Sequence, residues 1–443
     1  MGVRVDSALA KDILDVVGIG FGPSNLALAI ALTEHNQQGG ALTARFLERK
    51  LEFGWHQGML LEGATMQVSF LKDLATLRNP VSQFSFLSYL HTRNRLADFV
   101  NHKSFFPSRV EFHDYFRWCA DQLSPLVDYG TEAVTARPVY EAGMVTHYEV
   151  TARCVVTGRI TALLARNVVV APGLSPELPA GITAGERIWH SSEFLDRVGG
   201  ITDPRRLMVV GAGQSAAEIV DHLHRAFPSA EVYAVFARFG YSQADDSPFA
   251  NRIFDPAAID DFHAATEETK SALLAYHANT NYAVVDVDLI KDLYARTYEE
   301  KVRGVSRLRL LNMSRLKSAR ASGDGVEVTI RHENTARESL VEVDALVCAT
   351  GYRETDPTTL LGEVEPLLWR DEQDRLRVER DYRVATGPEV LAGVYLCGGT
   401  EHSHGITSSL LSTSAVRAGD IVQSIVTRVE THAAPLRANA GTS

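Results

Sequence analysis

Two short stretches of the sequence have the residue types of a turn that binds nucleotide phosphates. One holds Gly20, Gly22, Pro23 and Asn25, and the other holds Gly211, Gly213, Gln214, Ser215 and Ala216. Apolar residues precede each stretch and helix-forming residues follow it, which indicates a strand, a tight turn and a helix. Glycines there let the backbone approach a pyrophosphate, whose charge the N–H groups and dipole at the helix N-terminus stabilise. We therefore expect two dinucleotide sites.

The residue that follows the next strand in each unit distinguishes the two nucleotides. Glu48 ends the predicted strand 44–48, where a carboxylate can accept hydrogen bonds from both ribose hydroxyls of FAD. Arg238 follows the predicted strand 231–237, where a cation pairs with the 2′-phosphate of NADPH. Asn25 replaces the third glycine of the usual fingerprint, and Glu48 supports the first site despite this departure. Two such nucleotides on one chain imply electron transfer between them.

Further apolar stretches divide the chain around these turns. Residues 168–173 are typical of a buried strand ending in a Pro-Gly turn, and residues 174–179 are interpreted as a connection. A domain boundary is therefore expected near residues 175–205. Residues 344–348 are interpreted as a return into the first domain, 394–399 as the last strand, and 408–425 as the last helix.

These elements predict an α/β fold with two Rossmann-like dinucleotide-binding domains and a smaller, mainly helical substrate-binding region. The FAD-binding domain is expected to be discontinuous and to comprise residues 12–200 and 345–428. The NADPH-binding domain is expected at 201–344, with the substrate-binding insertion at about 242–300. Residues 429–443, rich in Ala and Thr, are predicted to form a disordered tail.

Composition excludes several other classes of protein. The chain has 443 residues, 45% of them hydrophobic and 22% charged, which is typical of a globular protein of two or three domains. A net charge of -11 without a basic run argues against nucleic acid as a partner. Neither a signal-like N-terminus nor an apolar stretch long enough to span a membrane is present, so we expect a cytoplasmic protein without membrane contact. The four cysteines and the 15 histidines lack the spacings of a dithiol or metal site, and no metal is expected.

Six stretches are familiar as a set and occur in a familiar order. They are residues 20–25, 66–74, 107–115, 245–251, 279–282 and 349–352. Together they resemble the amine N-hydroxylating flavin monooxygenases, specifically the L-ornithine N5-monooxygenases of hydroxamate siderophore biosynthesis. The resemblance runs from about residue 12 to residue 425, and both 245–251 and 279–282 are of the ornithine type rather than the lysine type.

The resemblance implies a reaction and a set of site residues. Ornithine, NADPH and O₂ would give N5-hydroxyornithine, NADP⁺ and water through a C4a-hydroperoxyflavin, attacked by the unprotonated side-chain amine. By motif, the substrate would be bound by Lys72, Asn251, Asn281 and Ser408; FAD by the first turn, Glu48, Trp55, His56 and Gln67; and NADPH by the second turn, Gln214, Ser215 and Arg238. Met66, Gln67 and Asn281 would lie beside the flavin, and the oligomer would be a dimer or tetramer if one forms.

Simpler interpretations exist for several of these residues. Lys72 has the surroundings of a solvated charge, Asn251 and Asn281 those of turn residues, and Met66 those of a core side chain. His56 is as consistent with a structural hydrogen bond as with a flavin contact. An amide oxygen can nevertheless accept from an amine without favouring its protonated form, whereas a carboxylate would favour it.

Three other functions compete with ornithine hydroxylation. Lysine or a diamine could be the amine, although Lys72 would have no carboxylate to bind in a diamine. A pyridine nucleotide-disulfide reductase shares a duplicated fold but needs a cysteine pair, which is missing near residues 50–70. The third alternative is a non-catalytic nucleotide-binding redox sensor.

Overall fold

A computed structural model describes residues 12–439 of the chain, with side chains to residue 429. The helices are α1 (Pro23–Gln37), α2 (Phe86–Thr92), α3 (Leu96–His102), α4 (Arg109–Gln122), α5 (Phe194–Val198), α6 (Gln214–Ala226), α7 (Pro256–Ala264), α8 (Glu267–Tyr276), α9 (Ala278–Asn281), α10 (Val287–Val302), α11 (Glu401–His404) and α12 (Ser414–Asn439). Short 3₁₀ helices are η1 (Gln57–Met59), η2 (Ser124–Leu126), η3 (Ser191–Glu193), η4 (Ala250–Phe254), η5 (Pro357–Leu360), η6 (Gly362–Leu367), η7 (Ile406–Ser409) and η8 (Leu411–Thr413).

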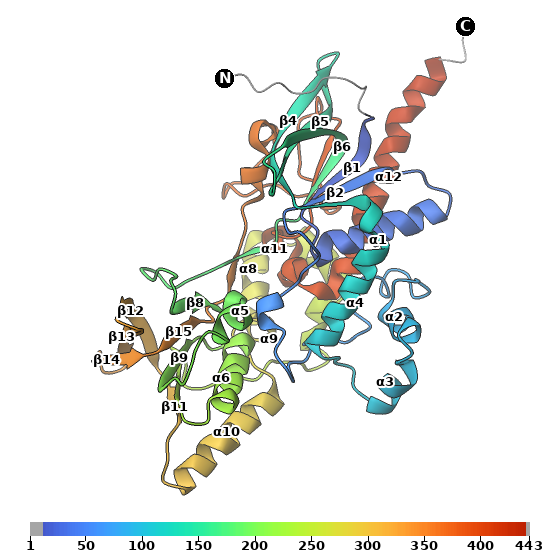
Figure 1. Cartoon of the computed structure of the whole chain (residues 1–443). Helices are drawn as coiled ribbons and strands as arrows, with labels where there is room; N and C mark the ends of the chain where they lie inside the picture. The colour runs from blue at the N-terminus through green and yellow to red at the C-terminus, as the bar shows by residue number, and fades with distance from the viewer. Residues whose placement is uncertain (1–11, 440–443) are drawn as a thin grey trace.

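Strands from distant parts of the chain assemble into separate sheets. They are β1 (Leu14–Ile19), β2 (Ala44–Glu48), β3 (Val127–Tyr129), β4 (Thr131–Glu141), β5 (Met144–Cys154), β6 (Ile160–Val170), β7 (Leu174–Pro176), β8 (Ile188–His190), β9 (Arg206–Val210), β10 (Glu231–Val235), β11 (Leu308–Leu311), β12 (Ser314–Ser322), β13 (Gly325–His332), β14 (Glu338–Val343), β15 (Ala345–Cys348), β16 (Tyr352–Glu354) and β17 (Gly393–Leu396). Figure 1 shows two main units, one around β1 and one around β9, with α4 between them.

The first unit is built on a seven-stranded sheet of order β3-β2-β1-β6-β5-β4, with β17 paired to β6. Strands β1, β2, β6 and β17 are parallel, and β4 and β5 extend the sheet as an antiparallel hairpin. The carboxyl-terminal halves of the central strands, residues 16–19 of β1 and 168–170 of β6, are continuous runs of buried residues without polar side chains, as expected where a sheet is covered on both faces. Helices α1 and α12 pack against each other beside this sheet.

The second unit is a fully parallel five-stranded sheet of order β11-β10-β9-β15-β8. Helix α6 follows β9 and packs on the sheet with a buried face that includes Ile219 and Val220. A three-stranded antiparallel sheet, β12-β13-β14, flanks it. Each main sheet thus has the strand, glycine turn and helix predicted from the sequence, so the prediction of two Rossmann-like units is confirmed.

Two predicted domain boundaries are wrong. The sequence predicts that β15 returns into the first domain, but β15 lies in the second sheet between β9 and β8. Strand β8 was placed in the first domain and also belongs to the second sheet. Parallel neighbours in a sheet are separated by long connections in the sequence. The residues of a short apolar strand therefore do not show which sheet the strand joins. The predicted last strand was correct, because β17 pairs with β6 of the first sheet.

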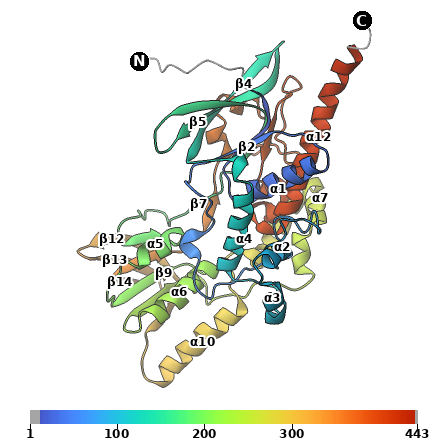
Figure 2. The ribbon, with the colours of Figure 1, turned by 45° about the vertical axis from the view of Figure 1, so that its right-hand side comes forward.

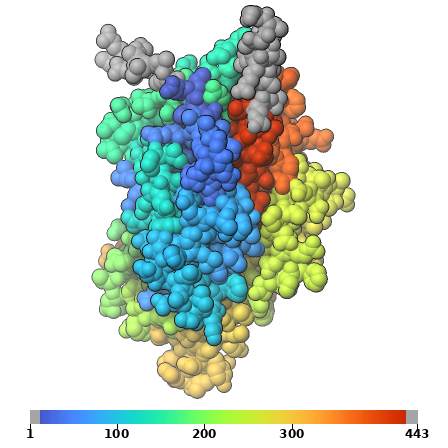
Figure 3. Space-filling model, turned by 90° about the vertical axis from the view of Figure 1, so that its right-hand side faces the viewer, coloured from blue at the N-terminus to red at the C-terminus, as the bar shows by residue number. Residues whose placement is uncertain are grey.

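The segment at 242–300 is mainly helical, as predicted, and contains η4 and the helices from α7 to most of α10. It extends back from the second unit to the first, where α7 contacts α11 and η4 contacts η7. Figure 2 shows α7 beside α12, and in Figure 3 this segment, yellow to yellow-green, forms a lobe next to the red C-terminal residues. The predicted substrate-binding insertion therefore lies where the two units meet.

The C-terminal prediction needs a further correction. The last helix was expected at 408–425 and a disordered tail from residue 429, but η7 and η8 precede α12, and α12 continues to Asn439. Residues 426–434 include no Gly or Pro that would stop a helix, which accounts for its continuation past residue 425 as far as residue 434, although α12 as a whole also includes Pro435. Residues 440–443 of the predicted tail lie outside the described part. None of the helices within residues 12–439 combines the length and apolar composition needed to cross a bilayer.

Candidate active site

The first glycine turn joins β1 to α1, as predicted. Gly20 has φ of 82°, and a Cβ there would overlap the carbonyl oxygen of Ala171. Gly22 caps α1 with φ of -84°, and a Cβ there would meet no described atom within 4 Å. The fold itself therefore requires a glycine at position 20, whereas at position 22 the missing side chain leaves space in front of the helix N-terminus. Such a space is where a phosphate group binds.

Asn25 and Glu48 hold this turn in place. The Asn25 side-chain amide donates to the carbonyl oxygens of Ile19 at 3.2 Å and Gly20 at 2.7 Å, which explains a buried Asn where a glycine is usual. Glu48 is 9% exposed and accepts from the backbone N–H groups of Phe21 at 2.7 Å and Lys50 at 2.9 Å. A carboxylate accepts about four hydrogen bonds. Glu48 can therefore still accept from a ribose.

Trp55 and His56 lie on the side of this unit that faces β16. The His56 ring contacts Trp55, with 4.7 Å between centroids, and Tyr352 of β16 lies 6.1 Å away. His56 is exposed as a residue, but the protein atoms around its ring desolvate the imidazole and, with the cations Arg109 and Lys50, lower its pKa to about 4. The imidazole is therefore neutral at physiological pH.

The second turn joins β9 to α6 and contacts the insertion. Gly211 has φ of 146°, and a Cβ there would overlap the carbonyl oxygen of Ala349. Gly213 caps α6, and its Cβ position lies 3.4 Å from the Cα of Ala283. Arg238, just beyond β10, donates to the carbonyl oxygen of Ala283 at 2.9 Å. The predicted NADPH residues are thus close to the end of α9.

Lys72 is held against the insertion. Its Nζ lies 5.7 Å from the centroid of the Phe254 ring, which belongs to η4 together with Asn251. No carboxylate of the described chain forms an ion pair with Lys72, whereas the adjacent Asp73 is buried and accepts from the backbone N–H groups of Ala75, Thr76 and Phe86. These hydrogen bonds to Asp73 hold the backbone after Lys72 in place, and burial raises the pKa of the Asp73 carboxyl group. Within the described residues, Lys72 is therefore a half-buried cation that lies near an aromatic ring and forms no ion pair.

The two predicted substrate asparagines have different surroundings. Asn251 donates through its side chain to the carbonyl oxygen of Asp246 at 2.6 Å, a local turn contact. Asn281, at the end of α9, makes no side-chain hydrogen bond within the described residues. The next residue, Tyr282, donates to the Glu401 carboxylate of α11 and so fixes the end of α9 against the first unit. Asn281 is therefore free to bind a ligand where the units meet.

Ser408 is one of four buried hydroxyls that lie near the last strand and have no hydrogen-bond partner in the described residues. They are Thr400, Ser408, Ser412 and Thr413. Ser408 is in η7, which contacts η4. Buried polar atoms are normally hydrogen-bonded, and an unpaired group costs about 1–3 kcal/mol. Each of these hydroxyls, Ser408 included, can therefore make a further hydrogen bond.

Met66 and Gln67 belong to a segment fixed by backbone pairing. The N–H of Met66 donates to the carbonyl oxygen of Pro107 at 2.9 Å, and that of Phe70 donates to the carbonyl oxygen of Phe105 at 2.9 Å, so residues 66–70 lie beside residues 105–107, where the next family-like stretch begins. Met66 is buried in the first core and Gln67 is exposed. Core packing thus accounts for Met66, and of the two only Gln67 is accessible to a ligand.

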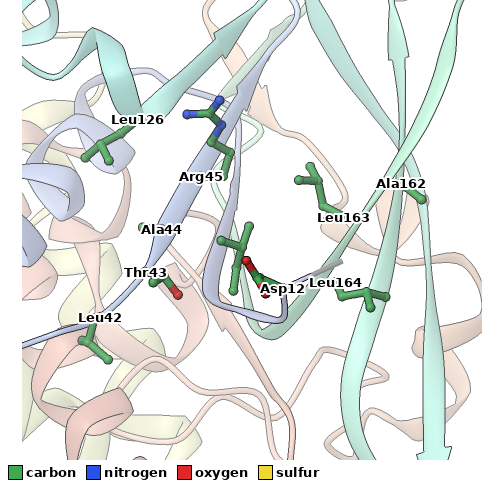
Figure 4. A pocket seen from close by; sticks show the side chains of 10 residues that line it. Asp12, Leu42, Thr43, Ala44, Arg45, Leu126, Ala162, Leu163 and Leu164 are labelled. Carbon is green, nitrogen blue, oxygen red and sulfur yellow. The ribbon is translucent and has the colours of Figure 1, made fainter. Parts of the chain in front are cut away.

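A pocket of about 580 Å³ lies elsewhere in the first unit (Figure 4). Its lining includes Asp12, Leu14, Leu42 and Leu164, at the ends of β1 and β2 away from the glycine turn. Ligands of open α/β sheets bind at the carboxyl ends of the strands. This pocket is therefore not part of the candidate active site.

Sequence reasoning missed three residues that shape the site: Phe254 beneath Lys72, and the buried ion pair between Arg109 and Glu218. Glu218 could have been noticed, because it is a charge among the apolar residues of α6, one turn after the glycines. Phe254 gave no signal, since nothing in its neighbourhood predicts contact with residue 72. Arg109 was within a recognised stretch but received no role.

Comparison with known proteins was decisive for the family. Residues 12–354 match the family described as L-lysine 6-monooxygenase/L-ornithine 5-monooxygenase. The chain belongs to this family. The ornithine N-hydroxylase of Kutzneria sp. 744, in a structure with reduced FAD, NADP⁺ and L-ornithine, has a TM-score of 0.90 and 47% identity over 94% of this chain and 100% of that chain. The family and the fold predicted from the sequence are thereby confirmed.

Other family members are similar over most of their length. An L-ornithine N(5)-monooxygenase of Burkholderia cepacia is 41% identical over 406 residues, which are 89% of this chain and 90% of that protein. The ornithine hydroxylase of Pseudomonas aeruginosa has a TM-score of 0.89 and 36% identity over 94% of this chain and 100% of that chain. The family covers both the unit around β1 and the unit around β9.

Proposed function

We propose that this protein is an L-ornithine N5-monooxygenase, which uses FAD, NADPH and O₂ to hydroxylate the side-chain amine of ornithine. The product would be N5-hydroxy-L-ornithine, a building block for hydroxamate siderophores or related natural products. The main structural support is Lys72, a cation beside the insertion that joins the two units, which forms no ion pair with any carboxylate in the described part of the chain. The substrate carried by the relatives supports ornithine as the amine.

FAD fits the first unit. Its pyrophosphate would lie at the N-terminus of α1, in the space left by Gly22, and Glu48 would accept from the ribose. When bound and reduced, FAD supplies the reaction of the enzyme with O₂.

NADPH fits the second unit. The N-terminus of α6, with Ser215 in its first turn, would hold the pyrophosphate, and Arg238 would pair with the 2′-phosphate. Only part of the Arg238 guanidinium is used by the carbonyl of Ala283, and its remaining N–H groups suit a phosphate. Gln214, the first residue of α6, would lie at the same place, and its side chain bonds to Glu218 and accepts from the backbone N–H of Asp286.

Ornithine would bind between the units. Lys72 would hold its carboxylate, Asn251 and Ser408 its α-amino end, and Asn281 the side-chain nitrogen. Asn281 is neutral, and its amide oxygen can accept from the amine without raising the pKa of that amine as a carboxylate would. The lone pair needed for reaction with oxygen is then retained.

One side-by-side assay tests this proposal. NADPH oxidation and hydroxylamine product are measured with ornithine, lysine and putrescine on the FAD-loaded protein. We expect hydroxylated product with ornithine above all. Discrimination against lysine rests on one methylene group, worth about 1–3 kcal/mol, or roughly 10- to 200-fold. More hydroxylated product from lysine than from ornithine would overturn the assignment of ornithine as the substrate. Oxidation of NADPH without hydroxylated product from any of the three amines would overturn the assignment of N-hydroxylation as the reaction.

A further inference from the structure

A buried ion pair connects the two units directly. Arg109, at the start of α4 in the first unit, donates hydrogen bonds from both terminal nitrogens to the carboxylate oxygens of Glu218, in α6 of the second unit, at 2.8 and 2.7 Å. The two side chains are only 12% and 6% exposed. Such a two-point pair fixes the orientation of both groups as well as their distance.

The pair lies in a contact made by the loop around η1. Met59 and Leu61 of this first-unit loop pack into the apolar core of the second unit, beside Trp189 and Phe194. A Cβ on Gly58 would overlap the carbonyl oxygen of Ser192, so the backbones of these two segments are in close contact. Arg109 also donates to the carbonyl oxygen of Met59 at 2.9 Å. Apolar packing is not directional, whereas the Arg109–Glu218 pair is, and the pair can therefore fix the angle between the units.

Glu218 continues this connection into the second glycine turn. Its Oε1 accepts from the side chain of Gln214, the first residue of α6, at 3.0 Å. The other end of that side chain accepts from the backbone N–H of Asp286 at 2.8 Å. A continuous path of hydrogen bonds thus runs from α4 of the first unit to the start of the helix at the nicotinamide-nucleotide turn.

Charge also favours a pair at this position. Glu218 lies four residues, or about 6 Å of helix, beyond the α6 terminus that would bind a pyrophosphate. An uncompensated carboxylate there would repel a nucleotide, and Arg109 compensates it. The ion pair therefore lets a rigid connection to the first unit exist close to an anion site.

We propose that Glu218 is a positioning residue that, through Arg109, sets the placement of NADPH relative to the flavin and thereby the rate of hydride transfer. This inference rests on the proposed use of FAD and NADPH. Small misplacements of reacting groups cost large factors in rate, so losing the connection should slow flavin reduction more than it weakens nucleotide binding.

The test compares Glu218→Gln with Glu34→Gln in the FAD-loaded enzyme. Glu34 is a matched control, because it is also 6% exposed and pairs with Arg78 at 2.7 Å, but entirely within the first unit. Flavin reduction is followed without oxygen at saturating NADPH. We expect the rate to fall about tenfold or more in Glu218→Gln, with the Kd for NADPH unchanged or lower because a negative charge is removed, and to stay within about twofold in Glu34→Gln.

A control measurement and a second variant complete the test. Reduction by dithionite, which needs no nucleotide, should be equal in all variants. If Glu218→Gln does not fold, Arg109→Lys, which keeps the charge but loses the two-point geometry, replaces it. Equal NADPH reduction rates in the wild type and in the folded variant overturn the inference. Failure of NADPH to reduce the wild type would instead overturn the proposed function.

Discussion

The ammonium group of Lys72 lies 5.7 Å from the centre of the Phe254 ring, so a cation of the first unit is packed on the insertion of the second. A cation above a ring face is attracted by about 0.5–2 kcal/mol. This attraction orients the Lys72 side chain and leaves its positive charge without a neutralising partner. A carboxylate of a bound amino acid would then complete the charge pair.

The first prediction follows from this contact. Lys72→Ala should raise the ornithine KM about 10- to 150-fold, because a charge-assisted hydrogen bond is worth about 1.5–3 kcal/mol, and FAD content should not change. Phe254→Leu, which keeps an apolar side chain without the ring face, should raise the KM only a few-fold. Steady-state hydroxylation over a range of ornithine concentrations measures both. Lys291→Ala, at an exposed lysine of α10, is the control and should match the wild type.

Gly22 offers a test of the FAD site that leaves the fold intact. Gly22→Ala should not lower the thermal midpoint of the apoprotein, because its φ suits alanine and no described atom lies near the new Cβ. It should nevertheless reduce FAD binding, since the Cβ takes the space of a pyrophosphate. Gly20→Ala should destabilise the apoprotein itself by at least about 1–2 kcal/mol, because its φ is 82°. Full flavin content in Gly22→Ala would contradict the placement of FAD.

Arg238 should decide between the two nicotinamide nucleotides. Arg238→Ala should lower kcat/KM for NADPH about 10- to 100-fold, through loss of a charge-assisted phosphate contact, and change kcat/KM for NADH little. NADPH and NADH oxidation are compared in the same preparation. An equal loss with both would mean that Arg238 acts only by supporting the carbonyl of Ala283.

His404 should make stability depend on pH. The ring is 1% exposed, is stacked on Tyr382 and faces His263, Arg380 and Arg417, and burial is the main cause that lowers its pKa to about 3. Above about pH 6.5 the ring is neutral in both folded and unfolded chains, so no stability is lost there. Below that pH only the unfolded chain gains the proton. Between about pH 7 and pH 5 the loss is then about 2 kcal/mol.

The measurement is the unfolding midpoint at both pH values for the wild type and for His404→Phe. The variant keeps a ring on Tyr382 but cannot be protonated, so it should be less stable near neutral pH and lose less on acidification. An equal loss of stability in both proteins would show that protonation of His404 does not cause the pH dependence in this range.

The sequence was sufficient for the local units and insufficient for their assembly. The places of Gly20 and Gly22 at the turn from β1 to α1, of Glu48 at the end of β2 and of Arg238 just beyond β10 could be predicted, because a strand, a turn and a helix are adjacent in the chain. Strand β15 was assigned to the wrong sheet, because the pairing of a four-residue apolar strand is decided by distant partners. Local pattern was thus reliable within a unit and not between units.

The same limit applies to the candidate site. Lys72 was located by family resemblance, but its neighbour Phe254 is far from it in the sequence and was not predicted. Arg109 and Glu218 are separated by 109 residues, and no local rule pairs them. In both cases the contact depends on how the insertion and the two sheets meet, which only the folded chain shows.

Turnover under isotopically labelled O₂ tests the central claim most directly. The FAD-loaded protein is supplied with NADPH and L-ornithine, and the product is analysed by mass spectrometry, with fragmentation to locate the label. We predict ornithine that carries one labelled oxygen atom on its side-chain nitrogen, with close to one product formed per NADPH consumed. Unlabelled ornithine accompanied only by hydrogen peroxide, or label on an atom other than that nitrogen, would contradict the assignment.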